Sequence, residues 1–168
     1  DDAIAKDIEF LKNFQDGEFL VTSRTLDDSQ WTVAYILDDG PVKFYRYLRN
    51  KDAAPTKDSM VFLFNNRDDL ADYPLVKMHD RVIKSRDGLD LVSYLSLPPG
   101  SDPDNDGVPD KPVPMVLDVH GGPWARDGWG LNSTHQWLAN RGYAVLSVNY
   151  RGSTGFGKDF INASNGEW

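Results

Sequence analysis

Apolar side chains recur every three or four residues at the start of the chain, at Ile4, Ile8, Leu11 and Phe14. This interval places them on one face of an α-helix, and Gly17 is a residue type that commonly follows a helix end. We therefore predict a short amphipathic helix over residues 3–14.

Four short runs rich in β-branched and aromatic residues come next, at 19–25, 31–37, 42–48 and 60–64. The segments between them are rich in Asp, Ser, Gly and Pro, which favour turns. Four consecutive short strands match the size of one blade of a β-propeller, and one blade cannot bury both of its faces by itself. Residues 1–76 are therefore predicted to be a helix and a blade-like sheet.

A hairpin is predicted at the start of the second half, where two strand-like segments, 79–85 and 89–97, flank Arg-Asp-Gly. A loop rich in Pro, Gly and Asp follows at 98–114. Residues 113–119 then form a nearly continuous apolar run, as expected for a strand covered on both faces.

An α/β pattern follows this apolar run. Residues 132–141 are predicted to be a helix that ends at Gly142, and 143–148 another buried strand. Strand, helix, strand implies a right-handed parallel crossover. The fold class is therefore α/β, with the blade-like sheet before it.

The charge of the chain limits its partners. A formal charge of -8 and a pI near 4.7 leave no basic face for phosphates, so neither nucleic acid nor an anionic membrane is expected as a partner. The chain has no cysteine, which excludes disulfides, thiolate zinc sites and a cysteine nucleophile. We expect a soluble protein, and its compartment, whether periplasmic, secreted or other, stays open.

The sequence His120-Gly121-Gly122-Pro123 directly follows the predicted strand 113–119. Acyl transfer needs backbone N–H donors aimed at the developing oxyanion, and glycines let the backbone come close to it. In α/β-hydrolases one donor follows the nucleophile and another comes from a His-Gly-Gly type loop after an earlier strand. The context favours that function over a tight turn that merely needs glycine.

A nucleophile is harder to find. A nucleophile elbow has the pattern Gly-x-Ser-x-Gly, and Ser153 has Arg151 where the first glycine belongs. Triad histidines of this fold follow the serine and the acid, which excludes His79, His120 and His135 as the base. We expect His135 to be a packed or exposed residue of the predicted helix.

Residues 152–159 follow a predicted strand and match the phosphate-binding pattern Gly-x-x-x-x-Gly-Lys except at the last position. Asp159 stands where a Ser or Thr would bind magnesium, and its carboxylate would repel phosphates. A plain glycine-rich turn beside the hydrolase site is therefore preferred to a nucleotide site.

The loop at 98–114 contains a candidate calcium site. Carboxylates occupy relative positions 1, 3, 5 and 9, at Asp102, Asp104, Asp106 and Asp110. Gly107 stands at position 6 and Val108 offers its carbonyl oxygen at position 7, as in loops that wrap calcium, but Val113 replaces the bidentate Glu of an EF-hand. A structural calcium site and a solvated acidic loop both stay open.

Together these motifs resemble the serine peptidases of the prolyl oligopeptidase family, particularly its dipeptidyl-peptidase and acylaminoacyl-peptidase branches. The most specific segments are 115–127, 136–146 and 149–157, and weaker similarity extends through 83–88 into the blade-like region. The resemblance implies a β-propeller over an α/β-hydrolase domain. Residues 1–76 would then be a helix and the last part of the propeller, and 77–168 the N-terminal portion of the hydrolase domain.

The resemblance also implies roles for the glycine motif. Gly122 would be an oxyanion donor, Gly121 would shape the turn, and His120 would line the substrate side of the pocket. The serine, aspartate and histidine of the family would lie beyond Trp168, either further along the chain or in a second polypeptide that completes the hydrolase domain.

The leading hypothesis is therefore the front part of a serine peptidase that cleaves short peptides through an acyl-enzyme and is inactive alone. It needs no cofactor, apart from the candidate structural calcium. An esterase on the same scaffold and a non-catalytic calcium-binding fragment are the alternatives. The blade-like first half favours the peptidase, since a propeller restricts access to short peptides.

Overall fold

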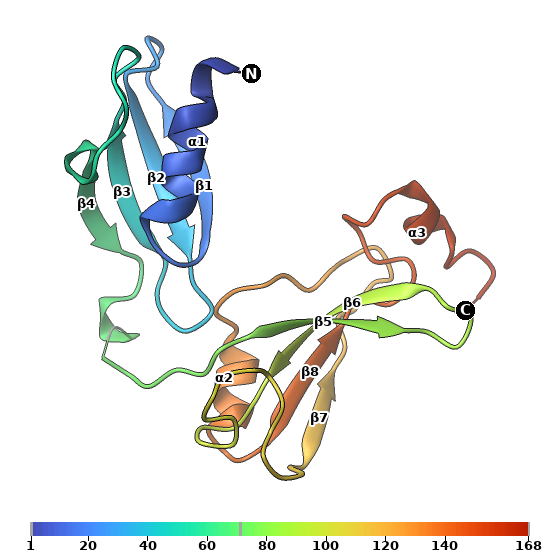
Figure 1. Ribbon diagram of the computed structural model, residues 1–168. Helices are drawn as coiled ribbons and strands as arrows, with labels where there is room; N and C mark the ends of the chain where they lie inside the picture. The colour runs from blue at the N-terminus through green and yellow to red at the C-terminus, as the bar shows by residue number, and fades with distance from the viewer. Residues whose placement is uncertain (1, 71, 168) are drawn as a thin grey trace. The chain divides into compact units, whose positions relative to one another are not determined.

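The computed structural model describes residues 2–70 and 72–167. The chain divides into two compact units, Asp1–Pro74 and Leu75–Trp168 (Figure 1). None of the helices in the described ranges combines the length and apolar character that a bilayer crossing requires.

The first unit is one helix on an antiparallel sheet of four strands in sequential order. Its elements are α1 (Asp2–Phe14), β1 (Glu18–Arg24), β2 (Gln30–Ile36), β3 (Lys43–Leu48) and β4 (Met60–Asn65). The predicted helix and four strands are thus confirmed. The 3-10 turns Lys57–Ser59 and Asp68–Leu70 were not predicted, because three residues are too short to show a period.

The core of the first unit lies where α1 covers one face of the sheet, as Figure 1 shows. Its buried side chains are Leu11, Trp31, Val33, Tyr35, Tyr47 and Met60. Each side chain of this size contributes about 1.5–3 kcal/mol when it is fully buried. The Tyr35 hydroxyl donates to the Leu11 carbonyl oxygen at 2.7 Å, so even the polar tip of this ring is satisfied in the core.

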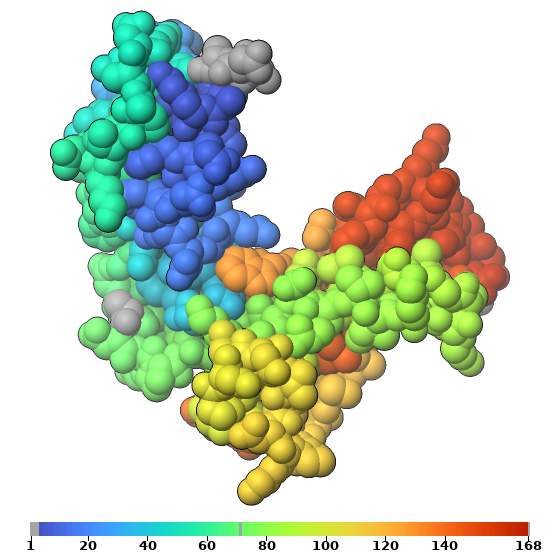
Figure 2. Space-filling view, in the orientation of Figure 1, coloured from blue at the N-terminus to red at the C-terminus, as the bar shows by residue number. Residues whose placement is uncertain are grey.

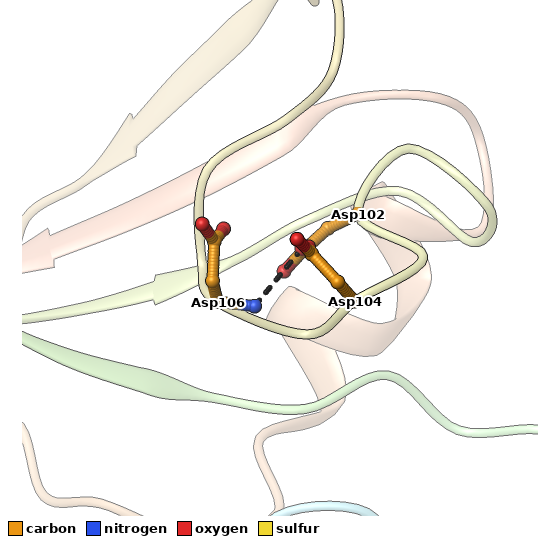
Figure 3. Close-up of side chains that lie close together, drawn as sticks. All are labelled: Asp102, Asp104 and Asp106. Atoms are coloured by element: carbon orange, nitrogen blue, oxygen red, sulfur yellow. Dashed lines mark hydrogen bonds between the residues drawn. The ribbon is translucent and has the colours of Figure 1, made fainter.

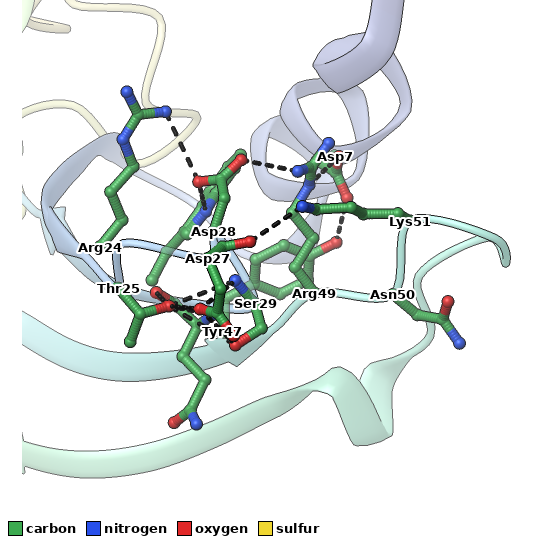
Figure 4. A network of polar contacts seen from close by, with 12 residues as sticks. Asp7, Arg24, Thr25, Asp27, Asp28, Ser29, Tyr47, Arg49, Asn50 and Lys51 are labelled. Carbon is green, nitrogen blue, oxygen red and sulfur yellow. Dashed lines mark hydrogen bonds and ion pairs between the residues drawn. The ribbon is translucent and has the colours of Figure 1, made fainter.

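A buried ionic network joins α1 to the strand ends (Figure 4). Arg49 Nε donates to Asp7 Oδ2 at 2.8 Å, and Arg49 Nη1 donates to Asp28 Oδ2 at 2.6 Å. The Tyr47 hydroxyl donates to Asp7 Oδ1 at 2.5 Å. Burial, and then the hydrogen bond to Asp7, raise the pKa of Tyr47 above its ordinary value. Both carboxylate oxygens of Asp7 are therefore paired inside the unit.

The second unit is built on a mixed sheet in the order β5-β6-β8-β7. Its elements are β5 (His79–Lys84), β6 (Asp90–Ser96), β7 (Met115–Asp118), α2 (Ser133–Ala139), β8 (Ala144–Val148) and α3 (Lys158–Asn162). The predicted hairpin, helix and parallel strand pair are confirmed. The helix α3 was missed, since its five residues offer only one buried apolar side chain, Phe160.

The strand β7 departs from its prediction. The run 113–119 was expected to be covered on both faces, yet Met115 is 58% exposed and Leu117 and Val119 are each 55% exposed. The expectation is wrong for the described residues because β7 is an edge strand and α2 packs on β6 and β8 instead. One apolar face of β7 is therefore uncovered within them.

His135 of α2 is completely buried among polar side chains of the second unit. Of the two predicted alternatives, a packed or an exposed helix residue, the packed one is confirmed. Nδ1 lies 3.0 Å from Ser96 Oγ and Nε2 lies 2.9 Å from Ser147 Oγ. Burial lowers the pKa of His135, although the charge of Asp118 opposes this. The imidazole is therefore a neutral link between α2 and two strands.

Candidate active site and candidate calcium loop

The strands β7 and β8 run parallel and end at the same edge of the sheet, since Asp118 pairs with Ser147 in the ladder. The segments that follow them are here called the β7 loop (119–127) and the β8 loop (149–157). In parallel sheets, ligands bind outside the carboxyl ends of the strands. These two loops therefore occupy the edge where a site is expected.

Gly121 and Gly122 lie exposed in the β7 loop, as the first residues of the turn after β7. Among the described residues, neither backbone N–H has an acceptor. An exposed backbone N–H group without an acceptor is the kind of donor that an oxyanion hole requires. The position of both candidate oxyanion residues is consistent with that chemistry.

Gly122 needs to be glycine for its backbone conformation. Its φ is 153°, and a Cβ at this position would lie 2.9 Å from the Trp124 nitrogen. At Gly121 a Cβ would meet nothing within 4 Å. A side chain at Gly122 would therefore force the turn to move, and with it the N–H groups.

His120 is held by the β8 loop. Its ring stacks on the Tyr150 ring, with centroids 4.5 Å apart and an interplanar angle of 17°. Nε2 lies 2.9 Å from Ser153 Oγ, and Nδ1 lies 2.9 Å from the Gly121 carbonyl oxygen. The Tyr150 hydroxyl donates to the His120 carbonyl oxygen at 2.9 Å. The ring is thus fixed on three sides.

The sequence analysis does not predict the contact between His120 and Ser153. A signal was present, because segments that directly follow neighbouring parallel strands meet at one edge. The pair is unsuited to nucleophilic attack, since Ser153 is completely buried and its hydroxyl also lies 2.7 Å from the Tyr150 carbonyl oxygen. The other ring nitrogen faces the Gly121 carbonyl oxygen, whereas a triad histidine faces a carboxylate.

A second connection joins the two loops through Asn149, which is completely buried. The Asp127 N–H donates to Asn149 Oδ1 at 2.9 Å, and Asn149 Nδ2 donates to the Asp127 carbonyl oxygen at 3.2 Å. The pKa of Asp127 is raised above its ordinary value, because burial raises it by more than the nearby His120 lowers it. Arg126 packs over the Phe156 ring, 4.8 Å from its centroid.

The glycines of the β8 loop have a packing role. Gly152 has a φ of 95°, and a Cβ there would lie 2.7 Å from Ser164 Cβ. Gly155 has a φ of 90°, and a Cβ there would lie 2.3 Å from Arg126 Nη1. The positive φ of both residues, and at Gly152 also the close approach of Ser164, account for these glycines, as expected for a glycine-rich turn.

The acidic loop joins β6 to β7 and forms a lobe at the surface (yellow in Figure 2). It brings together Asp102, Asp104 and Asp106, whose candidate ligand atoms all lie within 4.8 Å of one another. Figure 3 shows the three side chains converging, with the Asp106 N–H donating to Asp102. Asp110 is not in this group, and Val108 is exposed.

Fixed groups organise the acidic loop. Asp102 Oδ2 accepts from the Gly107 N–H at 2.8 Å and lies 3.4 Å from His79 Nε2. Arg81 Nη2 donates to the Asp106 carbonyl oxygen at 2.8 Å. The hydrogen bond with Asp102, and then the charge of Asp106, raise the pKa of Asp104. The carboxylates therefore repel one another, and a bound cation would relieve that repulsion.

Comparisons with known proteins extend over the whole chain. Residues 129–168 match the model of the prolyl oligopeptidase family. The chain is 54% identical over 168 residues to dipeptidyl aminopeptidase BIII of Pseudoxanthomonas mexicana, covering 100% of this chain and 24% of that protein. It is 39% identical to dipeptidyl peptidase family member 6 of Caenorhabditis elegans, covering 97% of this chain and 23% of that protein.

A solved acylaminoacyl peptidase of Pyrococcus horikoshii shares the fold, with a TM-score of 0.61 and 20% sequence identity over 88% of this chain and 21% of that chain. The chain spans about a quarter of the length of the curated relatives it matches. The resemblance read from the motifs is confirmed by these matches: the chain is homologous to the serine peptidases of the prolyl oligopeptidase family.

Proposed function

We propose that this chain forms part of a serine peptidase that cleaves short peptides through an acyl-enzyme. The observation that carries the proposal is the pair of exposed N–H groups of Gly121 and Gly122, without acceptors among the described residues, at the carboxyl end of β7. The relatives are named as dipeptidyl peptidases, which supports short peptides as the substrate class.

In the proposed mechanism, a serine outside this segment attacks the scissile carbonyl group. Gly122 donates its N–H to the resulting oxyanion, and Gly121 shapes the turn that presents it. One such donor typically stabilises the transition state by about 3–4 kcal/mol. His120 lines the substrate side of the turn.

The proposed architecture follows the same homology. The first unit is the last part of a β-propeller, and the second is the N-terminal portion of an α/β-hydrolase domain. The exposed Phe62, Leu63 and Phe64 of β4, and the uncovered face of β7, support this arrangement, because both strands present apolar surface that neighbouring elements would cover.

Labelling with a fluorophosphonate tests the proposal. The complete protein that contains this segment is expected to take one label and to cleave dipeptide anilides. The 168-residue chain alone is expected to take none. A label on Ser153 of the isolated chain would show that the nucleophile lies within it.

An esterase on the same scaffold is distinguished by substrate. A peptidase cleaves a dipeptide amide and the matching ester through the same acyl-enzyme, with both reactions abolished by the label. Hydrolysis of the ester without any cleavage of the amide would favour the esterase.

We further propose that the acidic loop binds calcium as a structural ion, through Asp102, Asp104 and Asp106, with the Val108 carbonyl oxygen and Asp110 as further ligands. The convergence of three carboxylates supports this proposal. Calorimetric titration with calcium tests it. Saturable heats are expected that disappear when Asp104 and Asp106 are both changed to Asn, and equal, negligible heats from the two proteins would contradict the site.

A further inference from the structure

The two peptide units that carry the candidate oxyanion donors are each held at their carbonyl oxygen. A trans peptide is planar, so its C=O and N–H point in opposite directions. The Gly121 N–H shares its peptide unit with the His120 carbonyl oxygen, and the Gly122 N–H shares one with the Gly121 carbonyl oxygen. Fixing these two oxygens therefore fixes the directions of both donors.

Tyr150 fixes the first peptide unit. Its hydroxyl donates to the His120 carbonyl oxygen at 2.9 Å, while its ring stacks on the His120 ring. Tyr150 directly follows Asn149, whose side chain binds the Asp127 backbone on both sides. The hydroxyl therefore reaches the turn from a backbone that is itself anchored to the β7 loop.

The His120 ring fixes the second peptide unit, and Ser153 fixes the ring. A carbonyl oxygen can only accept, so the 2.9 Å contact between His120 Nδ1 and the Gly121 oxygen requires a hydrogen on Nδ1. Nε2 then takes Ser153 Oγ as its partner at 2.9 Å. The single hydrogen of the Ser153 hydroxyl is shared between Nε2 and the Tyr150 carbonyl oxygen, which lies 2.7 Å from Ser153 Oγ and holds the hydroxyl in place.

We propose that Ser153 and Tyr150 are positioning residues for the oxyanion hole: through the ring and carbonyl group of His120 they set the directions of the Gly121 and Gly122 N–H groups. The inference rests on the proposed peptidase function. In this role Ser153 and His120 act without Ser153 being a nucleophile. The β8 loop holds the β7 loop in its conformation.

Two single-atom changes in the complete protein test this role. Tyr150→Phe removes the hydroxyl and keeps the stacked ring, and Ser153→Ala removes the partner of the His120 ring. Ser164→Ala is the matched control, because Ser164 is equally buried and its hydroxyl likewise donates to a carbonyl oxygen three residues earlier, that of Ile161.

Both test variants are expected to lower kcat per labelled site by about tenfold or more, short of the roughly hundredfold to thousandfold loss when a donor is removed. KM is expected to stay nearly unchanged. The affinity for a peptide aldehyde, which forms an oxyanion with the nucleophile, is expected to fall with kcat. Ser164→Ala is expected to match the wild type in all three quantities.

Fluorophosphonate stoichiometry separates positioning from folding. A purely structural role would reduce the number of sites labelled and leave kcat per labelled site unchanged, which would overturn the inference. An unchanged aldehyde affinity would overturn it as well.

Hydrogen exchange gives a readout that does not depend on activity. The Thr154 N–H donates to the Ala125 carbonyl oxygen at 2.9 Å between the two loops. Its exchange is expected to accelerate in Ser153→Ala but not in Ser164→Ala. If the wild type takes no label, the proposed function fails, and this exchange still decides whether Ser153 holds the β7 loop: equal exchange in the wild type and Ser153→Ala overturns the inference.

Discussion

Arg49 Nε donates to Asp7 Oδ2 at 2.8 Å, and the two side chains are 4% and 0% exposed. The pair joins the end of β3 to α1 inside the first unit. Two buried charges are costly to remove from water, so removing one partner leaves the other uncompensated.

Changing Arg49 to Met is therefore expected to destabilise the first unit by about 3–5 kcal/mol. Urea unfolding, followed by hydrogen exchange in β2 and β3, measures the change. Arg67→Met is the control, because its pair with Asp69 is exposed and screened by solvent, so its loss is expected to change the unfolding free energy little. Equal effects of the two changes would show that the Arg49 pair is not buried in solution.

The stability of the second unit is expected to fall in acid because of His135. Burial lowers its folded-state pKa, whereas the unfolded chain has an ordinary value of about 6.5. As the pH is lowered, the unfolded state therefore binds the proton before the folded state does. The contribution of neutral His135 to the free energy of unfolding is complete above about pH 6.5 and is lost as the pH falls below that value. Unfolding free energies between pH 5 and 8 measure this slope. His135→Gln should flatten it, and an unchanged slope would assign it to other groups.

Gly122→Ala is expected to lower kcat by about a hundredfold or more in the complete protein, because the added Cβ meets the Trp124 nitrogen and displaces the donor. Steady-state kinetics on a dipeptide anilide measures the loss. Gly128→Ala is the control, since a Cβ at Gly128 meets nothing within 4 Å and should leave kcat unchanged. A fully active Gly122→Ala enzyme would remove the glycine turn from the mechanism.

Calcium binding at the acidic loop is expected to strengthen as the pH rises through the titration of Asp104. Its pKa is raised above the ordinary value, so protons compete with the cation at mildly acidic pH. Calorimetry at pH 4.5 and pH 7 measures the difference. Asp104→Asn should weaken binding more than Asp110→Asn, since Asp110 lies outside the converging group. The reverse order would place the ion elsewhere in the loop.

Sequence patterns predicted most of the fold. The helical interval from Ile4 to Phe14 was recoverable because one face of the helix packs on the core, and the short strands were recoverable because turn residues separate runs of β-branched and aromatic side chains. The exposure of Leu117 could not be predicted, because an apolar run does not reveal whether a second layer covers it. The helix α3 could not be predicted either, because five residues are too few to show a helical period.

The glycine turn was recognisable from sequence, whereas its support was not. The two glycines of His120-Gly121-Gly122 indicate accessible backbone N–H donors. The contact of Ser153 with His120, in contrast, depends on how two loops about thirty residues apart in the sequence meet. Parallel pairing of β7 and β8 brings those loops together, and only the register of the sheet fixes which side chains touch.

The uncovered face of β7 affects how the isolated chain behaves. Met115 and Leu117 are exposed on a strand whose outer edge has unpaired backbone groups among the described residues. An apolar open edge is a template for pairing with another strand, including that of a second copy. Concentrated solutions of the 168-residue chain are therefore expected to self-associate, and charged substitutions at Met115 and Leu117 are expected to keep the chain monodisperse.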